Sequence, residues 1–268
     1  MRGRVLIVAG SDSGGGAGIQ ADIKTVTALG GYAATAVTAL TAQDTLGVHS
    51  VHAVPPEFIA RQMILVLSDI GADAVKTGML GEASVIEAVA DVLESSARGI
   101  PLVLDPVMVA KGGARLLDED AVGALTARLL PLAFVITPNI PEAETLTGQT
   151  IEGPDDMEAA GRDLVAMGAR AALVKGGHLK GPEVVDVLVE AAGVRRFAGP
   201  RIDSRSTHGT GCTLASAIAC SLAQGAALAA AVGRARAYVR TAIETAPGFG
   251  KGHGPLNHGH TVAPFPGR

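Results

Sequence analysis

Short apolar runs alternate along this chain with longer stretches in which apolar residues recur at helical spacing. Six runs predict buried strands bounded by turn-forming residues: Val5–Ala9, Ala33–Leu40, Ala74–Lys76, Leu102–Leu104, Phe134–Ile136 and Ala171–Val174. Helices are predicted over residues 17–29, 57–69, 83–97, 115–129, 155–167 and 212–225. Strands that alternate with helices in this way predict an α/β fold, with a mostly parallel sheet covered by helices on both faces.

A β-hairpin is expected after the last of these strands. Val184–Glu190 and Gly193–Ala198 have the pattern of two paired strands and suit an antiparallel edge of the sheet. No long linker, repeat or low-complexity tract interrupts the chain. We therefore expect one domain over residues 1–268.

Polar residues or glycines follow every predicted parallel strand. These segments are residues 10–18, 41–43, 77–80, 105–108, 137–142 and 175–178. In open α/β sheets, ligands bind in the crevice outside the carboxyl ends of the strands. One such segment would be weak support, but six of them predict a single composite site along that edge of the sheet.

Composition narrows the class of protein. Apolar residues make up 48% of the chain and aromatic residues only 3%, so Ala, Val and Leu must fill the core. A net charge of −4 and the lack of a basic run argue against a nucleic-acid partner. Two cysteines do not make a disulfide framework, which favours free thiols and a cytoplasmic location. The first apolar run stops at Ala9, unlike a signal peptide, and no stretch has the bulk to span a membrane.

The segment Thr207–Cys212, with the sequence THGTGC, places a glycine turn directly before an apolar helix. The first turn of that helix would present unpaired N–H groups and the positive end of the helix dipole. Small residues let an anion such as phosphate approach this backbone. The alternative is structural: Thr207 or Thr210 caps the helix, and Cys212 is a buried thiol behind the cap.

The glycine-rich segment Gly14–Gly18 follows the first predicted strand. It is not a Walker A loop, because no Gly-Lys-Ser/Thr follows, and it lacks a complete dinucleotide fingerprint because residue 19 is Ile. It suits a tight turn on which a small planar substrate lies against the backbone. The neighbouring Asp12 and Asp22 either take part in the site or only cap the helix over residues 17–29 and face solvent.

A second group of polar residues follows the later strands. Asp105 ends a buried strand, so its carboxylate needs a cation, a metal-bound water or a lysine nearby. Asn139 and Glu142 surround a proline turn and either supply oxygen ligands to hydrated Mg²⁺ or cap a helix. Lys175 precedes two glycines and either neutralises phosphate charge or is a solvated loop lysine. Together with the 207–212 turn, these residues predict phosphoryl transfer from a nucleotide.

Eight segments then carry a family resemblance. They are AGSDSGGGAGIQADIKT (9–25), ALTAQDT (39–45), VKTGML (75–80), LDPVMVAKGG (104–113), ITPNIPEAE (136–144), LVKGGH (173–178), THGTGC (207–212) and GKGHGPLNH (250–258). In this order, they resemble the hydroxymethylpyrimidine/phosphomethylpyrimidine kinases of thiamine biosynthesis, which belong to the ribokinase-like superfamily. The resemblance spans nearly the whole chain and implies a ribokinase-like three-layer fold.

The resemblance implies an ATP- and Mg²⁺-dependent kinase. Such an enzyme phosphorylates the hydroxymethyl oxygen of 4-amino-5-hydroxymethyl-2-methylpyrimidine and then converts the monophosphate to the diphosphate. The motifs assign Gln43, Gly10, Asp12, Met79 and Val107 to the substrate, Lys175, Thr207 and Asp105 to the nucleotide, and Asn139 and Glu142 to magnesium. Gln43 suits a pyrimidine because an amide both donates and accepts hydrogen bonds.

The same resemblance places the transferring phosphoryl group at Gly209, Thr210, Gly211 and Cys212. Cys212 stands where many ribokinase-like enzymes have an aspartate base, and it acts either as the base or as a group that positions the substrate. A helix N-terminus should lower the pKa of its thiol, whereas bound ATP should raise it. Cys220, on the same predicted helix, is expected to be a small buried residue without a chemical role.

Four smaller expectations complete this picture. Asp44 stands where the resemblance predicts asparagine, which leaves open how the backbone beside Gln43 is held. Gly112 and Gly113 are candidates for a lid over the site. The segment after residue 250 should form a turn followed by a loose end. The resemblance and the apolar hairpin also favour a homodimer.

Other functions remain open at this point. A pyridoxine/pyridoxal kinase of the same superfamily acts on a similar methylated heterocycle with a hydroxymethyl group. A non-catalytic pyrimidine-binding protein would have lost the phosphate end of the site, yet Asn139, Glu142, Lys175 and the 207–212 turn are all present. A dinucleotide-dependent oxidoreductase is disfavoured, because both the glycine fingerprint and its acidic ribose partner are missing.

Overall fold

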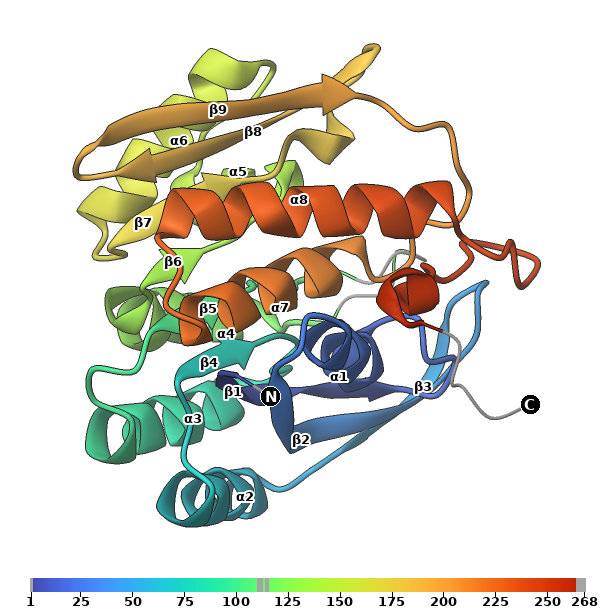
Figure 1. Cartoon of the computed structure of the whole chain (residues 1–268). Coiled ribbons are helices and arrows are strands. Elements are labelled where there is room, and N and C mark those ends of the chain that lie inside the picture. Colours follow the sequence, from blue (N-terminus) through green and yellow to red (C-terminus); the bar gives the residue numbers. More distant parts are fainter. Residues whose placement is uncertain (1, 110–112, 114–115, 264–268) are drawn as a thin grey trace, which may run out of the picture.

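A nine-stranded sheet forms the centre of the molecule (Figure 1). The computed structural model describes residues 2–109, 113 and 116–263. The strands are β1 (Arg4–Asp12), β2 (Tyr32–Gln43), β3 (Val48–Ala53), β4 (Ala74–Thr77), β5 (Leu102–Leu104), β6 (Val135–Ile136), β7 (Ala171–Val174), β8 (Glu183–Glu190) and β9 (Gly193–Pro200). Their order across the sheet is β3-β2-β1-β4-β5-β6-β7-β8-β9.

The middle of the sheet is parallel and both edges are antiparallel. Strands β2, β1, β4, β5, β6 and β7 run in the same direction. Strand β3 pairs antiparallel with β2 at one edge, and the hairpin β8–β9 pairs antiparallel with β7 at the other. Six carboxyl ends therefore point to the same side of the sheet, as the alternating sequence pattern predicts.

Helices cover both faces of the sheet. Eight α-helices are described: α1 (Gly18–Ala28), α2 (Pro56–Asp69), α3 (Ala83–Ser96), α4 (Glu119–Ala124), α5 (Ile140–Thr147), α6 (Pro154–Ala166), α7 (Thr210–Ala223) and α8 (Leu228–Glu244). Helices α1, α7 and α8 share an apolar core with one face, and α2 to α6 pack on the other. This arrangement confirms the predicted three-layer α/β architecture.

Three elements were not predicted. Strand β3 carries exposed and polar positions, so it has no apolar run. Helix α5 has only eight residues and begins with proline, which is favourable in the first turn of a helix but resembles a loop in sequence. Helix α8 follows the left-handed Gly225, where the predicted helix stopped, and its alternating Ala and Arg residues carry a weak apolar pattern.

Two predicted segments need correction. The helix expected over residues 115–129 is α4, continued by a π-helical turn over Leu125–Leu129 and a 3₁₀ turn over Leu130–Leu132, while residues 114 and 115 lie outside the described part. The expected loose end is ordered over His258–Thr261, which forms a 3₁₀ helix. There the His258 Nδ1 atom lies 3.2 Å from the Tyr238 hydroxyl, so the segment packs between α1 and α8.

Within the described residues, no helix has both the length and the apolar character needed to cross a membrane.

Candidate active site

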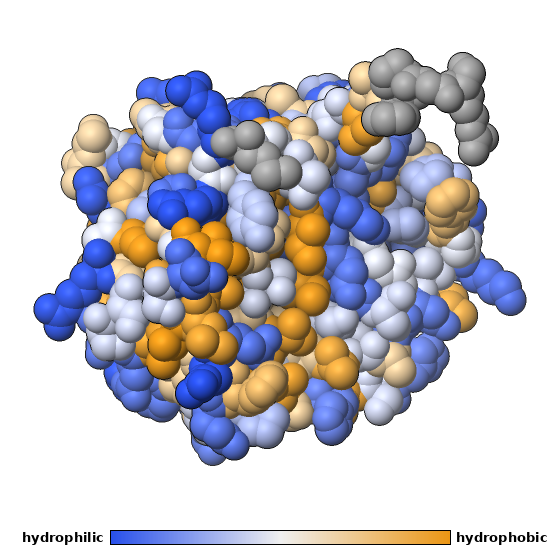
Figure 2. Space-filling model, turned by 60° about the horizontal axis from the view of Figure 1, so that its bottom comes forward, coloured by the Kyte–Doolittle hydropathy of each residue, from blue (hydrophilic) through white to orange (hydrophobic). Residues whose placement is uncertain are grey.

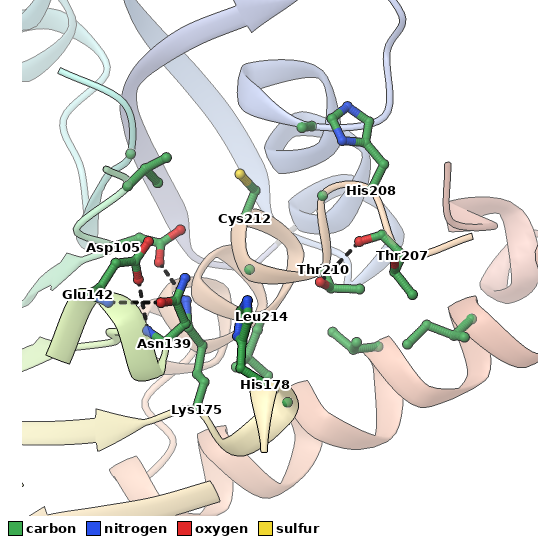
Figure 3. A pocket seen from close by; sticks show the side chains of 18 of the residues that line it. Asp105, Asn139, Glu142, Lys175, His178, Thr207, His208, Thr210, Cys212 and Leu214 are labelled. Carbon is green, nitrogen blue, oxygen red and sulfur yellow. Dashed lines mark hydrogen bonds and ion pairs between the residues drawn. The ribbon is translucent and has the colours of Figure 1, made fainter. Parts of the chain in front are cut away.

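One cavity of about 890 Å³ opens at the carboxyl ends of the parallel strands. All the residues that the sequence singled out for the site line this cavity: Gly10, Asp12, Gln43, Met79, Asp105, Val107, Asn139, Glu142, Lys175, Thr207, Gly209, Thr210, Gly211 and Cys212. Figure 3 shows several of them on different elements and facing the same space. The topology therefore brings together residues that lie up to about 200 positions apart in the chain.

Asp12 organises the loop that leads from β1 into α1. Its carboxylate accepts hydrogen bonds from the backbone amides of Gly14, Gly16 and Ala17, at 2.7 to 2.9 Å. It also lies 2.9 Å from His208 Nε2 in the 207–212 turn. Burial opposes the charge, but hydrogen bonds from His208, Gln43 and Ala17 outweigh it and lower the pKa of Asp12 to about 2. Asp12 thus links the glycine loop to the turn before α7.

The end of the cavity near β2 is lined by Met79, Gly10 and Gln43, and the Gln43 side chain hydrogen-bonds the Asp12 carboxylate. Met79 lies against Gly10, where a Cβ atom would come within 2.5 Å of the methionine Cε. The Ser13 hydroxyl bonds both the backbone N–H and the carbonyl of Gln43. Asp44 accepts hydrogen bonds from the amides of Leu46 and Gly47, so aspartate holds this turn where asparagine was expected.

The 207–212 turn enters α7 through a left-handed glycine. Gly209 has φ of 80°, and a Cβ atom there would lie 1.9 Å from the Gly16 carbonyl oxygen. No side chain caps the helix, and Thr210 is already its first residue. The alternative of a threonine N-cap is therefore wrong. The Gly209 backbone instead packs on the glycine loop and leaves the helix N-terminus facing the cavity.

Cys212 lies where the first turns of α1 and α7 meet. The Gly18 amide donates a hydrogen bond to its sulfur, and the side chain points into the cavity (Figure 3). Burial raises the pKa of the thiol to about 11, because Lys76 and the Gly18 amide only partly offset the loss of solvent. The expected lowering by the helix N-terminus is thus outweighed, and the thiol is protonated at neutral pH. Cys220 is fully buried, as predicted.

Asp105 and Lys175 form an ion pair on the other side of the turn. Lys175 Nζ lies 3.0 Å from Asp105 Oδ1, which also accepts a hydrogen bond from the Thr137 hydroxyl. Asp105 Oδ2 is buried and has no partner within the described part of the chain. The expected cation for Asp105 is therefore Lys175, and burial of the lysine is outweighed by its acidic neighbours, which raise its pKa.

Asn139 and Glu142 form a capping box at the start of α5. The Asn139 side chain accepts from the Glu142 amide, and the Glu142 carboxylate accepts from the Asn139 amide. The helix-cap alternative is thus realised, although both side chains also line the cavity. Burial raises the pKa of Glu142 to about 7, with Lys175 opposing and Asp105 adding to the shift.

Sequence reasoning missed a buried ion pair below the cavity. Lys76 in β4 and Asp22 in α1 are fully buried, and Lys76 Nζ lies 2.9 Å from Asp22 Oδ2. The alternative in which Asp22 caps α1 or faces solvent is therefore wrong. A lysine in the apolar strand Ala74–Thr77 was the available signal, because a buried ammonium requires a partner. His208 was missed as well, since its partner Asp12 is 196 residues away in the chain.

The far end of the cavity was also missed. It is lined by β9 and α8, among them Phe197, Arg236, Arg240 and Ile243. Neither element carries a recognisable binding motif, and α8 was not predicted at all. Of the proposed lid glycines, Gly112 lies outside the described residues and Gly113 is isolated between undescribed neighbours.

Comparison with known proteins places this geometry in a family. The family described as Phosphomethylpyrimidine kinase matches residues 12–257. The chain is 57% identical, over 96% of its length, to the "Thiamine biosynthesis bifunctional protein ThiED" of Geobacter sulfurreducens, and it spans 52% of that relative. It is 47% identical to the hydroxymethylpyrimidine/phosphomethylpyrimidine kinase of Bacillus subtilis, covering 95% of this chain and 94% of that protein.

Solved structures give the same result for the fold. Pyridoxal kinase from Bacillus subtilis, in an ADP complex, matches with a TM-score of 0.89 and 35% identity, over 97% of this chain and 98% of that one. Phosphomethylpyrimidine kinase from Clostridium difficile matches with a TM-score of 0.80 and 42% identity, over 90% and 99% of the two chains. With its predicted site residues gathered in one cavity, the chain belongs to the phosphomethylpyrimidine kinase family and has its ribokinase-like fold.

Proposed function

We propose that this protein transfers a phosphoryl group from ATP to 4-amino-5-hydroxymethyl-2-methylpyrimidine and then phosphorylates the monophosphate to the diphosphate, in thiamine biosynthesis. One observation carries the proposal. The 207–212 turn lines a single cavity together with Gln43 and Met79 near β2 and with Asp105 and Lys175 after β5 and β7. Acceptor, transferring phosphoryl group and nucleotide would then occupy successive parts of the same space.

The end of the cavity near Gln43 suits a small planar heterocycle. Met79 packs against Gly10, where the lack of a side chain leaves room, and Val107 adds to the wall. The Gln43 amide can donate to a ring nitrogen and accept from an exocyclic amine. Asp12 has its carboxylate engaged by backbone amides and His208, so we assign it to shaping the loop around the substrate.

The end of the cavity near Lys175 suits the nucleotide phosphates. The N-terminus of α7 contributes N–H groups from Gly209 to Cys212, and the Lys175 ammonium lies 3.3 Å from the position that a Cβ of Gly211 would occupy. Both features favour negative charge at the same point. Because phosphoryl transfer depends mainly on positioning and charge stabilisation, this arrangement provides what the reaction needs. Thr207, whose carbonyl accepts the Thr210 hydroxyl, holds the turn in place.

A magnesium ion suits the oxygen atoms beside Lys175. Asp105 Oδ2 is buried without a partner, and the Glu142 carboxylate and Asn139 amide oxygen line the same part of the cavity. Mg²⁺ keeps several waters and takes one or two carboxylates, which agrees with this small donor set. We therefore assign Asp105 as the direct ligand, with Asn139 and Glu142 acting through water. When bound, the ion would neutralise charge on the ATP phosphates.

Cys212 is assigned to positioning the acceptor. Its thiol is protonated at neutral pH, because burial raises its pKa to about 11. A protonated thiol is a poor proton acceptor but can orient the hydroxymethyl oxygen toward the phosphoryl group. A largely dissociative transition state places little demand on prior removal of the acceptor proton.

The direct test measures both phosphoryl transfers with Mg-ATP. The purified protein should convert the hydroxymethylpyrimidine to its monophosphate and the monophosphate to the diphosphate, as followed by mass spectrometry. Lys175→Met, which keeps an unbranched side chain one atom shorter but removes its charge, should abolish both steps. The exposed Lys180→Met provides a matched control and should leave them intact. Absence of both products in the wild-type protein would overturn the proposal.

Pyridoxal is a second candidate substrate. Pyridoxal kinases from Bacillus subtilis and Staphylococcus aureus match 97% of this chain at TM-scores of 0.89 and 0.88. The curated relatives named as pyrimidine kinases have higher identities, from 44 to 49%, than the 35% of these two pyridoxal kinases. We therefore expect a higher kcat/KM for the pyrimidine than for pyridoxal in parallel assays with ATP. The reverse order would make pyridoxal the principal substrate.

The protein is proposed to act in the cytoplasm as a homodimer. Two free thiols agree with a reducing compartment. Apolar side chains gather on the face that comes forward in Figure 2. Phe58 and Leu65 on α2 and Leu40 on the neighbouring β2 are each about half exposed. A second copy of the chain would remove this surface from water.

A further inference from the structure

Lys76 is a charged residue in the centre of an apolar sheet. It lies in β4, whose four residues are all buried, and none of its side chain is exposed. Its Nζ atom is 2.9 and 3.1 Å from the two carboxylate oxygens of Asp22. A buried ion pair of this kind contributes little net stability, because both charges lose their hydration. Its presence therefore calls for an explanation other than stability.

The ion pair is tied to the helix that carries Cys212. Asp22 lies on α1, and its Oδ1 atom accepts a hydrogen bond of 2.6 Å from the Ser216 hydroxyl. Ser216 follows Cys212 by four residues in α7, so both side chains lie on the same face of that helix. The pair thus joins β4, α1 and α7 about one helical turn below the thiol.

The Lys76 ammonium also reaches the cavity itself. Lys76 is among the lining residues, together with Cys212, Gly78 and Asp105. A Cβ atom at Gly78 would come within 2.9 Å of Lys76 Nζ, so glycine leaves the ammonium uncovered on that side. The lysine is therefore buried from bulk solvent yet forms part of the cavity floor.

Four charged groups act on Cys212, each from a different element. Lys76 in β4 lowers the pKa of the thiol, whereas Asp22 in α1 and Asp105 after β5 raise it. Lys175 after β7 is the fourth, and it interacts with the sulfur from the nucleotide side. Burial opposes the charge of Lys76, but attraction to Asp22, Cys212 and Asp105 raises its pKa well above the ordinary value. Lys76 therefore remains an ammonium at the pH of the reaction.

We propose that Lys76 supplies a fixed positive charge beneath the reacting centre, and that the Asp22 carboxylate beside it is the counter-charge that partly offsets it. The role of this charge in catalysis rests on the proposed phosphoryl transfer. Lys175 offers positive charge from the nucleotide side, and Lys76 offers it from below Cys212, where the acceptor oxygen would lie. Negative charge that gathers at this point during transfer would then be balanced from two sides.

The charge can be measured without any kinase activity, through the reactivity of Cys212. In a Cys220→Ala background, iodoacetamide should alkylate only Cys212, at a rate proportional to its thiolate fraction. At pH 9, which is below the pKa of the thiol, a shift of one unit in that pKa changes the alkylation rate about tenfold. Lys76→Met should slow alkylation about tenfold or more, and Asp22→Asn should accelerate it, because the ammonium then acts without its counter-charge.

Both substitutions break the same ion pair, so a purely structural role predicts changes in the same direction. Opposite changes support the proposal, and parallel changes, or no change in Lys76→Met, overturn it. The double variant Asp22→Asn/Lys76→Met removes both buried charges, protects against misfolding of the single variants, and should react at a rate between wild type and Lys76→Met. The exposed Lys180→Met should react like wild type, because solvent screens its charge.

Steady-state kinetics provide the second readout. If the proposed phosphoryl transfer is correct, Lys76→Met should lower kcat at least tenfold, with a much smaller change in KM for the pyrimidine. If kcat is unchanged in Lys76→Met although its thiol reactivity has fallen, the Lys76 charge does not contribute to phosphoryl transfer, and its proposed role in the reaction is wrong. A wild-type protein without kinase activity would contradict the proposed function alone, because the alkylation series would still measure the charge.

Discussion

At Cys212, a single side chain meets two helix N-termini and a buried lysine. Its thiol is protonated at neutral pH because burial raises the pKa to about 11. We expect Cys212→Ala to lower kcat about 100-fold, since the acceptor oxygen loses its orienting group. Cys212→Ser should retain considerably more activity, because a hydroxyl can make the same hydrogen bond. Steady-state assays of both variants, with the fold checked by circular dichroism, would measure this difference.

The two outcomes have distinct meanings for the thiol. If both variants keep nearly normal kcat, Cys212 takes no part in either proton transfer or positioning. If Cys212→Ser is as inactive as Cys212→Ala and wild-type kcat rises tenfold per pH unit up to pH 9, the thiolate is the base. The assignment to positioning requires a flat pH dependence over that range.

The ionisation of Asp12 makes the stability of the fold depend on pH in the acid range. Burial opposes its ionisation, but hydrogen bonds lower its pKa to about 2 in the folded protein. Because the pKa of Asp12 is lower in the folded protein than its value of 3.8 in the unfolded chain, ionised Asp12 stabilises the fold when the pH is above 3.8. This contribution is lost as the pH falls toward 2. Wild-type protein should therefore lose about 2 kcal/mol more unfolding free energy between pH 5 and 2 than Asp12→Asn does.

Urea denaturation at each pH would test this expectation. Asp203→Asn serves as a control, because its carboxylate is exposed in a loop and should leave the wild-type pH dependence unchanged. Parallel curves for wild type and Asp12→Asn would mean that the hydrogen bonds to Gly14, Gly16, Ala17 and His208 do not favour the charged form.

The turn before α7 depends on glycine at one position. An alanine at Gly209 would require a left-handed backbone and would bring its Cβ within 1.9 Å of the Gly16 carbonyl oxygen. We expect Gly209→Ala to destabilise the protein by about 3 kcal/mol or more and to weaken ADP binding. Gly225→Ala is the matched control: its φ is 86° but its surroundings are open, so about 1 kcal/mol is expected.

Thermal unfolding and calorimetric ADP titration would measure both effects. An equal loss of stability in the two variants would show that backbone conformation alone matters at Gly209. Unchanged ADP affinity in a folded Gly209→Ala protein would contradict the assignment of this turn to the nucleotide phosphates.

How far each element could be predicted depended on the range of its interactions. Strands β5 and β7 matched their predicted bounds, because a short apolar run between turn residues is a local signal. Helix α5 carries its capping box in sequence, yet its eight residues gave too short a periodic pattern. Strand β3 is held by pairing with β2 rather than by burial, so its own residues carry no strand pattern.

Across the whole molecule, topology made the composite site predictable. Parallel strands place their carboxyl ends together, so Asp12, Asp105, Asn139 and Lys175 converge without any further information. The ion pair of Asp22 with Lys76 could not be derived in the same way. Its partners are 54 residues apart, and only the packing of α1 onto the sheet brings them into contact. The pKa of the Cys212 thiol could not be predicted from local sequence either, because burial raises it more than the helix N-terminus lowers it.

Assembly is the remaining property of the whole molecule. Phe58 and Leu65 lie seven residues apart on α2 and are 58 and 55% exposed, so they share one apolar face. If this face joins two copies, Phe58→Glu/Leu65→Glu would bury four carboxylates in the interface. The dimer should then weaken at least about 100-fold. Sedimentation equilibrium at micromolar concentration should give a dimer for wild type and a monomer for the double variant. Val262→Glu, an exposed position after the segment that packs on α1, should remain dimeric. A wild-type monomer, or a double variant that stays dimeric, would place the α2 face outside any interface.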